Sequence, residues 1–124
     1  MNRDSRAEAL GALYAAEARG GPPEEAGLSA RARKLANGVW ENRRALDKEI
    51  AAAATGWRLE RMPAVDRAVL RLALYELRHT ETPIGVVISE AVALAKEYST
   101  ARSGPFVNGV LAKLAAGPSE DPGQ

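Results

Sequence analysis

Apolar residues recur at steps of three and four along most of the chain, which is the spacing of one face of an α-helix. The first such stripe follows Asp4, a residue type that caps helix N-termini. It consists of Ala7, Leu10, Leu13 and Tyr14. The pattern predicts a first helix over residues 4–19. Glycines and prolines at positions 20–23 end it, since neither residue type continues a helix, and residues 20–27 are predicted to form an exposed linker.

The second segment carries the longest apolar pattern. Its members are Leu28, Ala32, Leu35, Val39, Leu46, Ile50, Ala53 and Trp57. Only the step near Asn42 and Arg43 is missing from the series. We expect one helix of about 25 residues, roughly 40 Å long, with a single buried face. Gly38 lies in its middle, where a glycine costs up to about 1 kcal/mol, so it is predicted to let another backbone come close or to permit a bend.

Three further segments have the same periodicity. Residues 62–79 are apolar around most of the helix circumference, which predicts a buried central helix, and residues 84–98 carry one apolar stripe. The last helix is expected to begin near Pro105, since proline is favoured in a first helical turn. The chain is therefore predicted to be all-α, a single compact bundle of about five helices within residues 1–117. Residues 118–124, which are acidic, are predicted to be a disordered tail.

The composition excludes several kinds of chemistry. There is no cysteine and one histidine in 124 residues, which removes disulfides, thiolate metal sites, cysteine nucleophiles and paired-histidine metal sites. No nucleophile–base constellation can be assembled from the remaining side chains. We therefore expect no enzyme activity, no metal and no cofactor. No apolar run approaches the roughly 20 residues of a membrane span, and the N-terminus has no signal-peptide core, so a cytoplasmic protein is expected.

The charge balance is close to neutral, with 17 basic and 16 acidic residues and a net charge of +1. This sum is not typical of a nucleic-acid binder. Arginine nevertheless dominates the basic residues, which indicates either phosphate recognition by the planar guanidinium or biased codon usage. The abundant alanine favours codon usage. Arg3 and Arg6, on the first helical turn, are candidates for contact with a nucleic-acid backbone, although two arginines near an N-terminus are commonplace.

One candidate binding site lies where residues 100–105 lead into the last helix. The free N–H groups and the dipole of a helix N-terminus attract phosphate. Arg102 and Ser103 would add a cation and a hydroxyl there, and the ring of Phe106 could stack on an unpaired base. From periodicity alone, the preferred interpretation of Phe106 is a core residue. Without further information, the residues predict a helical binding module.

Several motifs follow one another along the chain. ALGALY lies near the start, and GVW with a downstream LD comes next; DRAVLRLALYEL begins at Asp66, and VVISEAVALAKEYS and FVNGVLAKL follow. Together they cover residues 7–114, and their order and spacing resemble the bacterial transcription antitermination factor NusB family. The resemblance implies the NusB-like RNA-binding helical fold. The same fold forms the N-terminal part of a family of ribosomal-RNA cytosine methyltransferases. This chain ends where the methyltransferase would begin, so we expect the stand-alone factor.

The resemblance implies two interfaces. NusB-like proteins bind the boxA element of nascent ribosomal RNA transcripts, a single-stranded RNA, as a heterodimer with the small-subunit ribosomal protein NusE. The complex keeps RNA polymerase termination-resistant. By resemblance, the RNA-binding residues carry over to Arg3, Arg6, Arg102, Ser103 and Phe106. The NusE-binding residues carry over to Tyr14 and Glu76, and Tyr14 as a plain core residue is an equal alternative. Some NusB-like proteins self-associate, so a homodimer is a further alternative.

The chain departs from the family pattern at several positions. Members usually carry a dense basic run before the first helix, whereas this chain has Arg3 and Arg6 with Asp4 between them. The glutamine usual in the ALY motif is Gly11, and the acidic residue usual in the last loop is Arg102. We expect weak RNA binding without NusE, since each lost phosphate contact lowers affinity. Two rival classes stay open: a helical adaptor that binds NusE without RNA, and an RNA-modifying accessory enzyme, against which the missing cysteine and cofactor domain argue.

Overall fold

The computed structural model describes residues 3–117, with side chains from Ser5 onward. Within these residues the regular structure consists of six α-helices, one short 3-10 helix and no strand. The bounds are α1 (Arg3–Arg19), α2 (Ala30–Glu41), α3 (Arg43–Ala53), η1 (Leu59–Arg61), α4 (Ala64–His79), α5 (Ile84–Tyr98) and α6 (Ser103–Ala116). The all-α prediction is confirmed, with six helices in place of about five. The predicted tail, residues 118–124, lies outside the described residues.

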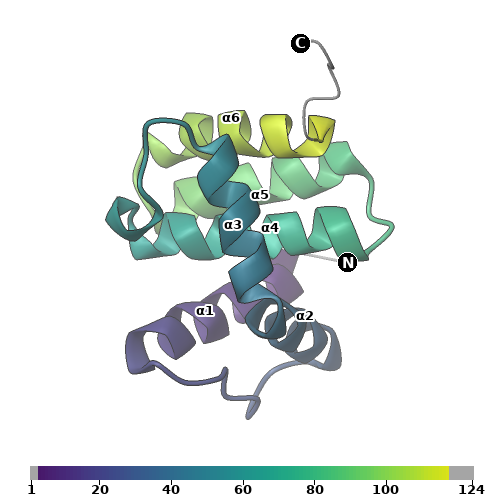
Figure 1. Ribbon diagram of the computed structural model, residues 1–124. Helices are drawn as coiled ribbons and strands as arrows, with labels where there is room; N and C mark the ends of the chain where they lie inside the picture. The colour runs from purple at the N-terminus through teal and green to yellow at the C-terminus, as the bar shows by residue number, and fades with distance from the viewer. Residues whose placement is uncertain (1–2, 118–124) are drawn as a thin grey trace.

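The helices are arranged around α4, which contacts every other α-helix (Figure 1). α4, α5 and α6 lie side by side, and α3 crosses the face of this layer. α1 and α2 pack against each other below it. Apolar side chains cover most of the circumference of α4, and six of them are buried: Ala68, Val69, Leu70, Leu72, Ala73 and Leu74. The prediction of a buried central helix is therefore confirmed.

The predicted long second helix is wrong, because the chain breaks it into α2 and α3. Asn42 separates the two, with φ −103° and ψ 10°, and its side-chain amide donates 2.8 Å to the carbonyl of Gly38. A side chain that donates a hydrogen bond to a backbone carbonyl in this way competes with the backbone hydrogen bonds of the helix. The break falls at the one step missing from the apolar series. α3 then ends at Ala53, and Gly56 adopts φ +85°, a conformation that glycine reaches without strain.

Trp57 follows this turn and is not part of the apolar helix face, which corrects the sequence-based assignment. Its side chain is 55% exposed. The chain direction changes at Gly56, after the end of α3. The spacing of four residues between Ala53 and Trp57 therefore does not place the two side chains on one helix face. Trp57 instead reaches the start of α6, as described below.

The connection between α1 and α2 runs from Gly20 to Ser29 and is largely exposed, as expected for residues 20–27, but it is tied to its neighbours. The Glu8 carboxylate accepts the Ser29 N–H at 2.8 Å, and Glu25 accepts from the Asn37 amide at 3.0 Å. Pro23 is buried, which departs from the exposed linker predicted. Among the described residues, no helix is long and apolar enough to cross a membrane.

Candidate nucleic-acid and partner interfaces

The loop between α5 and α6 is anchored to the start of α4 by a buried carboxylate. Asp66, in the first turn of α4, is 3% exposed. It accepts a hydrogen bond from the Ser99 hydroxyl at 2.5 Å and one from the Ser103 hydroxyl at 2.8 Å. Ser103 is 2% exposed and also accepts the N–H of Thr100 at 3.4 Å. These bonds set where α6 begins, at Ser103 and two residues before the start predicted at Pro105.

The hydroxyl of Ser103, a predicted RNA contact, is therefore occupied inside the protein. Its bonds to Asp66 give it a structural role in holding the loop. Its neighbour Arg102 is exposed, and its guanidinium group makes no hydrogen bond or ion pair with the part of the chain that the structure describes. The buried serine thus holds the loop that presents this arginine to solvent.

Phe106 lies one turn into α6 and is half-buried. It packs against the main core, as the periodicity suggested, and also against Trp57, with ring centroids 5.3 Å apart and planes tilted by 59°. A cavity of about 430 Å³ opens beside this aromatic pair. Arg61, Arg102 and the buried Asp66 also line it. The loop and the segment before α4 thus bring two aromatic rings and two arginines together.

The segment before α4 is held in place by Arg67. Arg67, on α4, donates to the carbonyls of Leu59 and Met62 at 3.0 and 2.8 Å, and so fixes η1 against the helix. Arg67 also pairs with Glu17 of α1, with 3.0 Å between Nε and Oε2. Burial by itself would raise the pKa of Glu17, but the hydrogen bond from Arg67 and the charges of Arg71 and Arg67 outweigh it and lower the pKa below 4.5.

Arg6 and Glu76, predicted to contact RNA and NusE respectively, form a buried ion pair with each other. Arg6 Nε and Nη2 each donate 2.8 Å to one oxygen of the Glu76 carboxylate. Both side chains are 2% exposed. The pair joins α1 to the last turn of α4, which gives both residues a structural role in this structure. Arg3 belongs to α1, but its side chain lies outside the described part of the chain.

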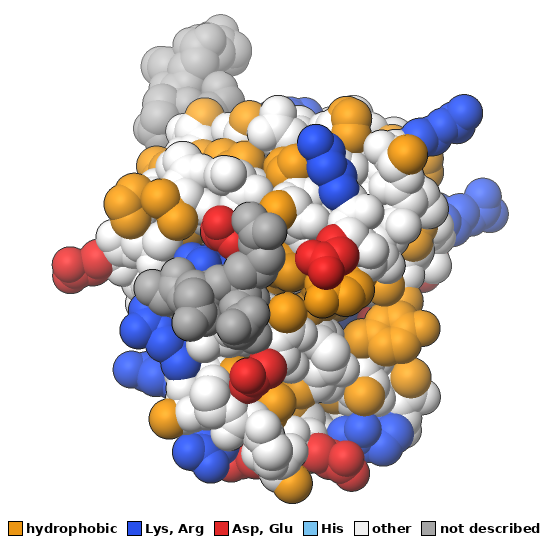
Figure 2. All heavy atoms as spheres, turned by 180° about the vertical axis from the view of Figure 1, so that it is seen from behind, with side chains coloured by type: hydrophobic (Ala, Val, Ile, Leu, Met, Phe, Trp, Pro, Cys, Tyr) orange, Lys and Arg blue, Asp and Glu red, His pale blue; other side chains and the backbone are white. Residues whose placement is uncertain are grey.

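Tyr14 is 47% exposed, which removes the alternative that it is a plain core residue. It lines a shallow apolar cavity of about 240 Å³ together with Tyr98 of α5, which is 48% exposed. The rest of the lining comes from Ala7, Leu10, Gly11 and Val65. Figure 2 shows one face of the molecule, on which exposed hydrophobic side chains gather between charged ones. A tyrosine offers rigid apolar area with a polar tip, which suits a protein partner.

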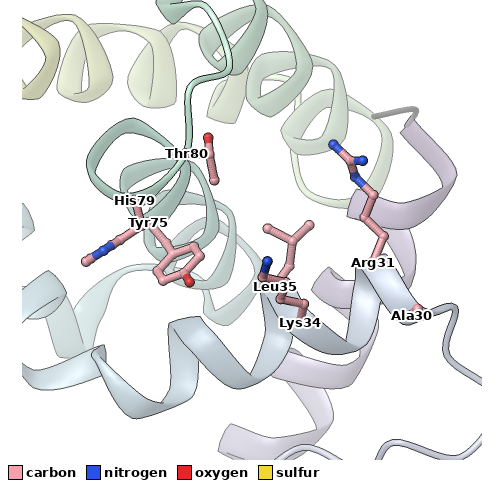
Figure 3. A pocket seen from close by; sticks show the side chains of 7 residues that line it. All are labelled: Ala30, Arg31, Lys34, Leu35, Tyr75, His79 and Thr80. Carbon is pink, nitrogen blue, oxygen red and sulfur yellow. The ribbon is translucent and has the colours of Figure 1, made fainter.

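A third depression lies at the opposite end of α4 (Figure 3). Side chains of α2 and of the end of α4 face each other across a groove of about 490 Å³. Its lining is Ala30, Arg31, Lys34, Leu35, Tyr75, His79 and Thr80. Tyr75 stacks on His79, with centroids 4.6 Å apart, and lies over Gly38 of α2. Gly38 therefore admits a close neighbour, but that neighbour is a tyrosine ring, whereas the sequence predicted another backbone or a bend.

Sequence reasoning missed four residues that shape these surfaces: Asp66, Trp57, Arg61 and Tyr98. Trp57 ends the apolar series of the second segment and Tyr98 ends the apolar stripe of residues 84–98, and this spacing predicts a core position for both. The sequence did signal Asp66, as an acidic residue at the start of an otherwise apolar helix. Among the described residues, no cluster of three or more histidine or acidic side chains is arranged to hold a metal ion.

Comparison with known proteins gives a consistent family match. A sequence model of the NusB family matches residues 3–116. A relative from Anaeromyxobacter dehalogenans, the transcription antitermination protein NusB, is 55% identical over 83 residues, which cover 67% of this chain and 58% of the relative. The match thus spans little more than half of that relative's length.

Solved structures have the same fold. NusB of T. maritima superposes with a TM-score of 0.84 at 35% identity, covering 93% of this chain and 90% of that chain. A crystal structure of antitermination factors NusB and NusE in complex with dsRNA contains a chain that superposes with a TM-score of 0.80 at 28% identity, covering 94% of this chain and 96% of that chain. The predicted NusB-like helical fold is confirmed.

Proposed function

This chain belongs to the NusB family, and we propose that it acts in bacterial transcription antitermination by binding RNA together with NusE. The RNA we propose is the single-stranded boxA element of nascent ribosomal RNA transcripts, and the complex would keep RNA polymerase termination-resistant. The role is one of binding, without catalysis, and it is exercised in the cytoplasm.

The observation that carries this proposal is the exposed arginine and aromatic surface at the start of α6. Arg102 is presented to solvent by a loop that Asp66 anchors, and Phe106 lies next to it with part of its ring accessible. Guanidinium groups recognise phosphate, and aromatic rings stack on unpaired bases. Of the predicted RNA contacts, Arg102 and Phe106 are therefore the two that we propose touch RNA. Ser103 positions the loop.

We propose that RNA binding by the isolated chain is weak and that NusE completes the site. The sequence already has fewer basic residues at its N-terminus than its family pattern. The burial of Arg6 against Glu76 leaves Arg3 as the remaining arginine of that segment. Each phosphate contact that is lost reduces both the affinity and its dependence on salt. The Tyr14–Tyr98 cavity is the surface we propose for NusE.

The test is a titration of labelled boxA RNA at two salt concentrations, with and without NusE. We expect NusE to tighten binding by at least tenfold, about 1.4 kcal/mol, and higher salt to weaken it. Arg102→Ala should reduce affinity in both settings, whereas Arg44→Ala, which removes an exposed arginine of α3 from a different surface, should not. A salt-insensitive affinity that NusE does not change would contradict the proposal, and a scrambled RNA controls for sequence preference.

A second candidate function is a protein adaptor that binds NusE and has lost RNA binding. The observation in its favour is that two of the five predicted RNA contacts are bound inside the protein, Arg6 to Glu76 and Ser103 to Asp66. The adaptor predicts that NusE still binds and that no RNA binding is measured with or without it. It also predicts that Arg102→Ala leaves every complex unchanged.

A further inference from the structure

Trp57 occupies an unusual position for a large apolar side chain. More than half of its surface is exposed, yet it is in contact with Phe106 at the start of α6. Because the two planes are tilted by 59°, the rings do not cover each other face to face. The segment that carries Trp57 is held in place, since Arg67 binds the backbone of η1 just after it. Trp57 is therefore a fixed, accessible aromatic surface.

Two arginines flank this surface, one from each side of the cavity. Arg61 comes from η1 and Arg102 from the loop before α6, and both are exposed. Neither guanidinium group makes a hydrogen bond or ion pair with the described residues, although those of most other described arginines do. The one carboxylate in the lining, Asp66, is buried and bonded to Ser99 and Ser103. Both guanidinium groups are thus available to an anion.

We propose that Trp57 and Arg61 extend the RNA-binding surface, with an unpaired base stacking on Trp57 and the flanking phosphates contacting Arg61 and Arg102. This inference rests on the proposed function. The combination of accessible aromatic rings with unpaired cations is the chemistry that binds single-stranded nucleic acid. A protein partner fits less well, because the exposed tyrosine cavity on α1 and α5 offers an apolar surface without this concentration of positive charge.

The experiment measures affinity for boxA RNA and for the same RNA carrying abasic nucleotides, with NusE present. Trp57→Ala is expected to weaken binding of the intact RNA by about tenfold or more, the effect of losing one stacked base. At the position that stacks, an abasic nucleotide should weaken binding to the wild-type chain and have little further effect on Trp57→Ala. Ile84→Ala, which removes a similarly exposed apolar side chain from α5, is the matched control.

Two further measurements separate stacking from folding and from charge. Trp57→Phe keeps an aromatic ring and should retain most of the affinity, and in a Trp40→Phe background RNA should quench the fluorescence of Trp57. Arg61→Gln should lower the slope of log affinity against log salt by about 0.7, the value for one phosphate of a single strand. The equivalent change at Arg44 should leave the slope as it is.

The outcomes are distinguishable. If the wild-type chain binds RNA and Trp57→Ala binds equally well, the inference is wrong and the proposed function stands. If Trp57→Ala weakens NusE binding but not RNA binding, the cavity holds a protein side chain and the inference is wrong. If the wild-type chain binds no RNA even with NusE, both the inference and the proposed function fall. The inference would also be wrong if Trp57→Ala weakened binding of double-stranded RNA more than binding of single-stranded RNA.

Discussion

At the scale of single residues, arginine is used mainly to join helices. Three arginines of α4 bind carboxylates on α1 or α3: Arg67, Arg71 and Arg78. Arg6 of α1 binds a carboxylate of α4 in the buried interior. The fork geometry of the guanidinium suits such bidentate pairs. Four described arginines have guanidinium groups that make no hydrogen bond or ion pair in the described part of the chain: Arg31, Arg44, Arg61 and Arg102. The arginine excess therefore has a structural use that composition could not reveal.

The Arg6–Glu76 pair leads to a prediction about stability. Glu76→Ala should reduce the free energy of unfolding by about 3–5 kcal/mol, because it leaves a buried guanidinium without its carboxylate. A double change, Arg6→Met with Glu76→Leu, should recover most of this loss, since apolar residues of similar volume replace the whole pair. Denaturant unfolding measures both. If Glu76→Ala is as stable as the wild type and only NusE binding is lost, the sequence-based assignment of Glu76 to the partner interface is right.

Glu17 predicts how stability depends on pH. Its pKa is lowered in the folded chain, so the stability it contributes is fully present above the unfolded value of 4.5. That stability is lost as the pH falls from 4.5 through the lower folded value. The free energy of unfolding should therefore decrease over this range, and less steeply in Glu17→Gln. Unfolding curves at several pH values measure the slope, and an identical slope in the variant would show that other carboxylates account for it.

At the scale of helices, the two glycines Gly11 and Gly38 have opposite surroundings. A Cβ at Gly11 of α1 would meet nothing within 4 Å, whereas one at Gly38 of α2 would overlap the ring of Tyr75. Both glycines lie inside a helix, and the packing of α4 against α2 distinguishes them. Gly11 is the position where the family pattern has glutamine, and the open space there agrees with a larger residue.

This contrast predicts opposite effects of the same substitution. Gly11→Ala should stabilise the chain by about 0.5–1 kcal/mol, the helix propensity difference. Gly38→Ala should destabilise it, since overpacking costs about 1–3 kcal/mol and exceeds that gain. Chemical denaturation of the two variants checks the prediction. Equal stabilisation would mean that Tyr75 moves away without cost.

The loop before α6 gives another prediction at this scale. Asp66→Ala should destabilise the chain by about 1–3 kcal/mol, because the buried hydroxyl of Ser103 loses its acceptor, and so does the half-buried hydroxyl of Ser99. RNA affinity should fall as well, because Arg102 loses its fixed position. Asp66→Asn keeps the shape and one acceptor oxygen and should be affected less. Thermal unfolding and the boxA titration measure the two effects, and a loss of RNA affinity without any loss of stability would contradict this positioning role.

At the scale of the whole molecule, the two candidate surfaces are formed by different elements. The Tyr14–Tyr98 cavity lies between α1 and α5, and the Trp57–Phe106 cavity lies between η1 and the start of α6. Both border the first turn of α4, which contributes Val65 to one and Asp66 to the other. The two surfaces are thus separate, as our proposal of one protein and one RNA partner requires, with α4 as the shared support.

The separation of the surfaces is testable with one pair of variants. Tyr14→Ala should weaken NusE binding by about tenfold or more, as expected for an aromatic residue at the centre of an interface, and leave RNA binding by the isolated chain unchanged. Arg102→Ala should weaken RNA binding by the isolated chain and leave NusE binding unchanged. Titrations with each ligand alone measure both effects. If either variant weakened both kinds of binding equally, the surfaces would not be independent.

The sequence by itself determined the helical class, the bounds of α1, α4 and α5 to within two residues, and the central position of α4. These features follow from local spacing, capping and helix-breaking residues, which act over a few positions. The family motifs also led to the exposed Arg102 and Tyr14. The break at Asn42 was visible as a missing step, but continuing the pattern across it predicted one helix in place of two.

Only the tertiary structure decided which polar and aromatic side chains face solvent. Arg6 and Glu76 are 70 positions apart and bury each other, and Ser103 binds Asp66 across 37 positions. Trp57 and Phe106 both follow apolar stripes in sequence, yet Trp57 is exposed and Phe106 is half-buried. Trp57 is exposed because Gly56 turns the chain out of α3. Periodicity reports the face of a helix on which a residue lies. It does not report what a distant helix places against that face, and that contact decides whether the side chain of an arginine is available to a ligand.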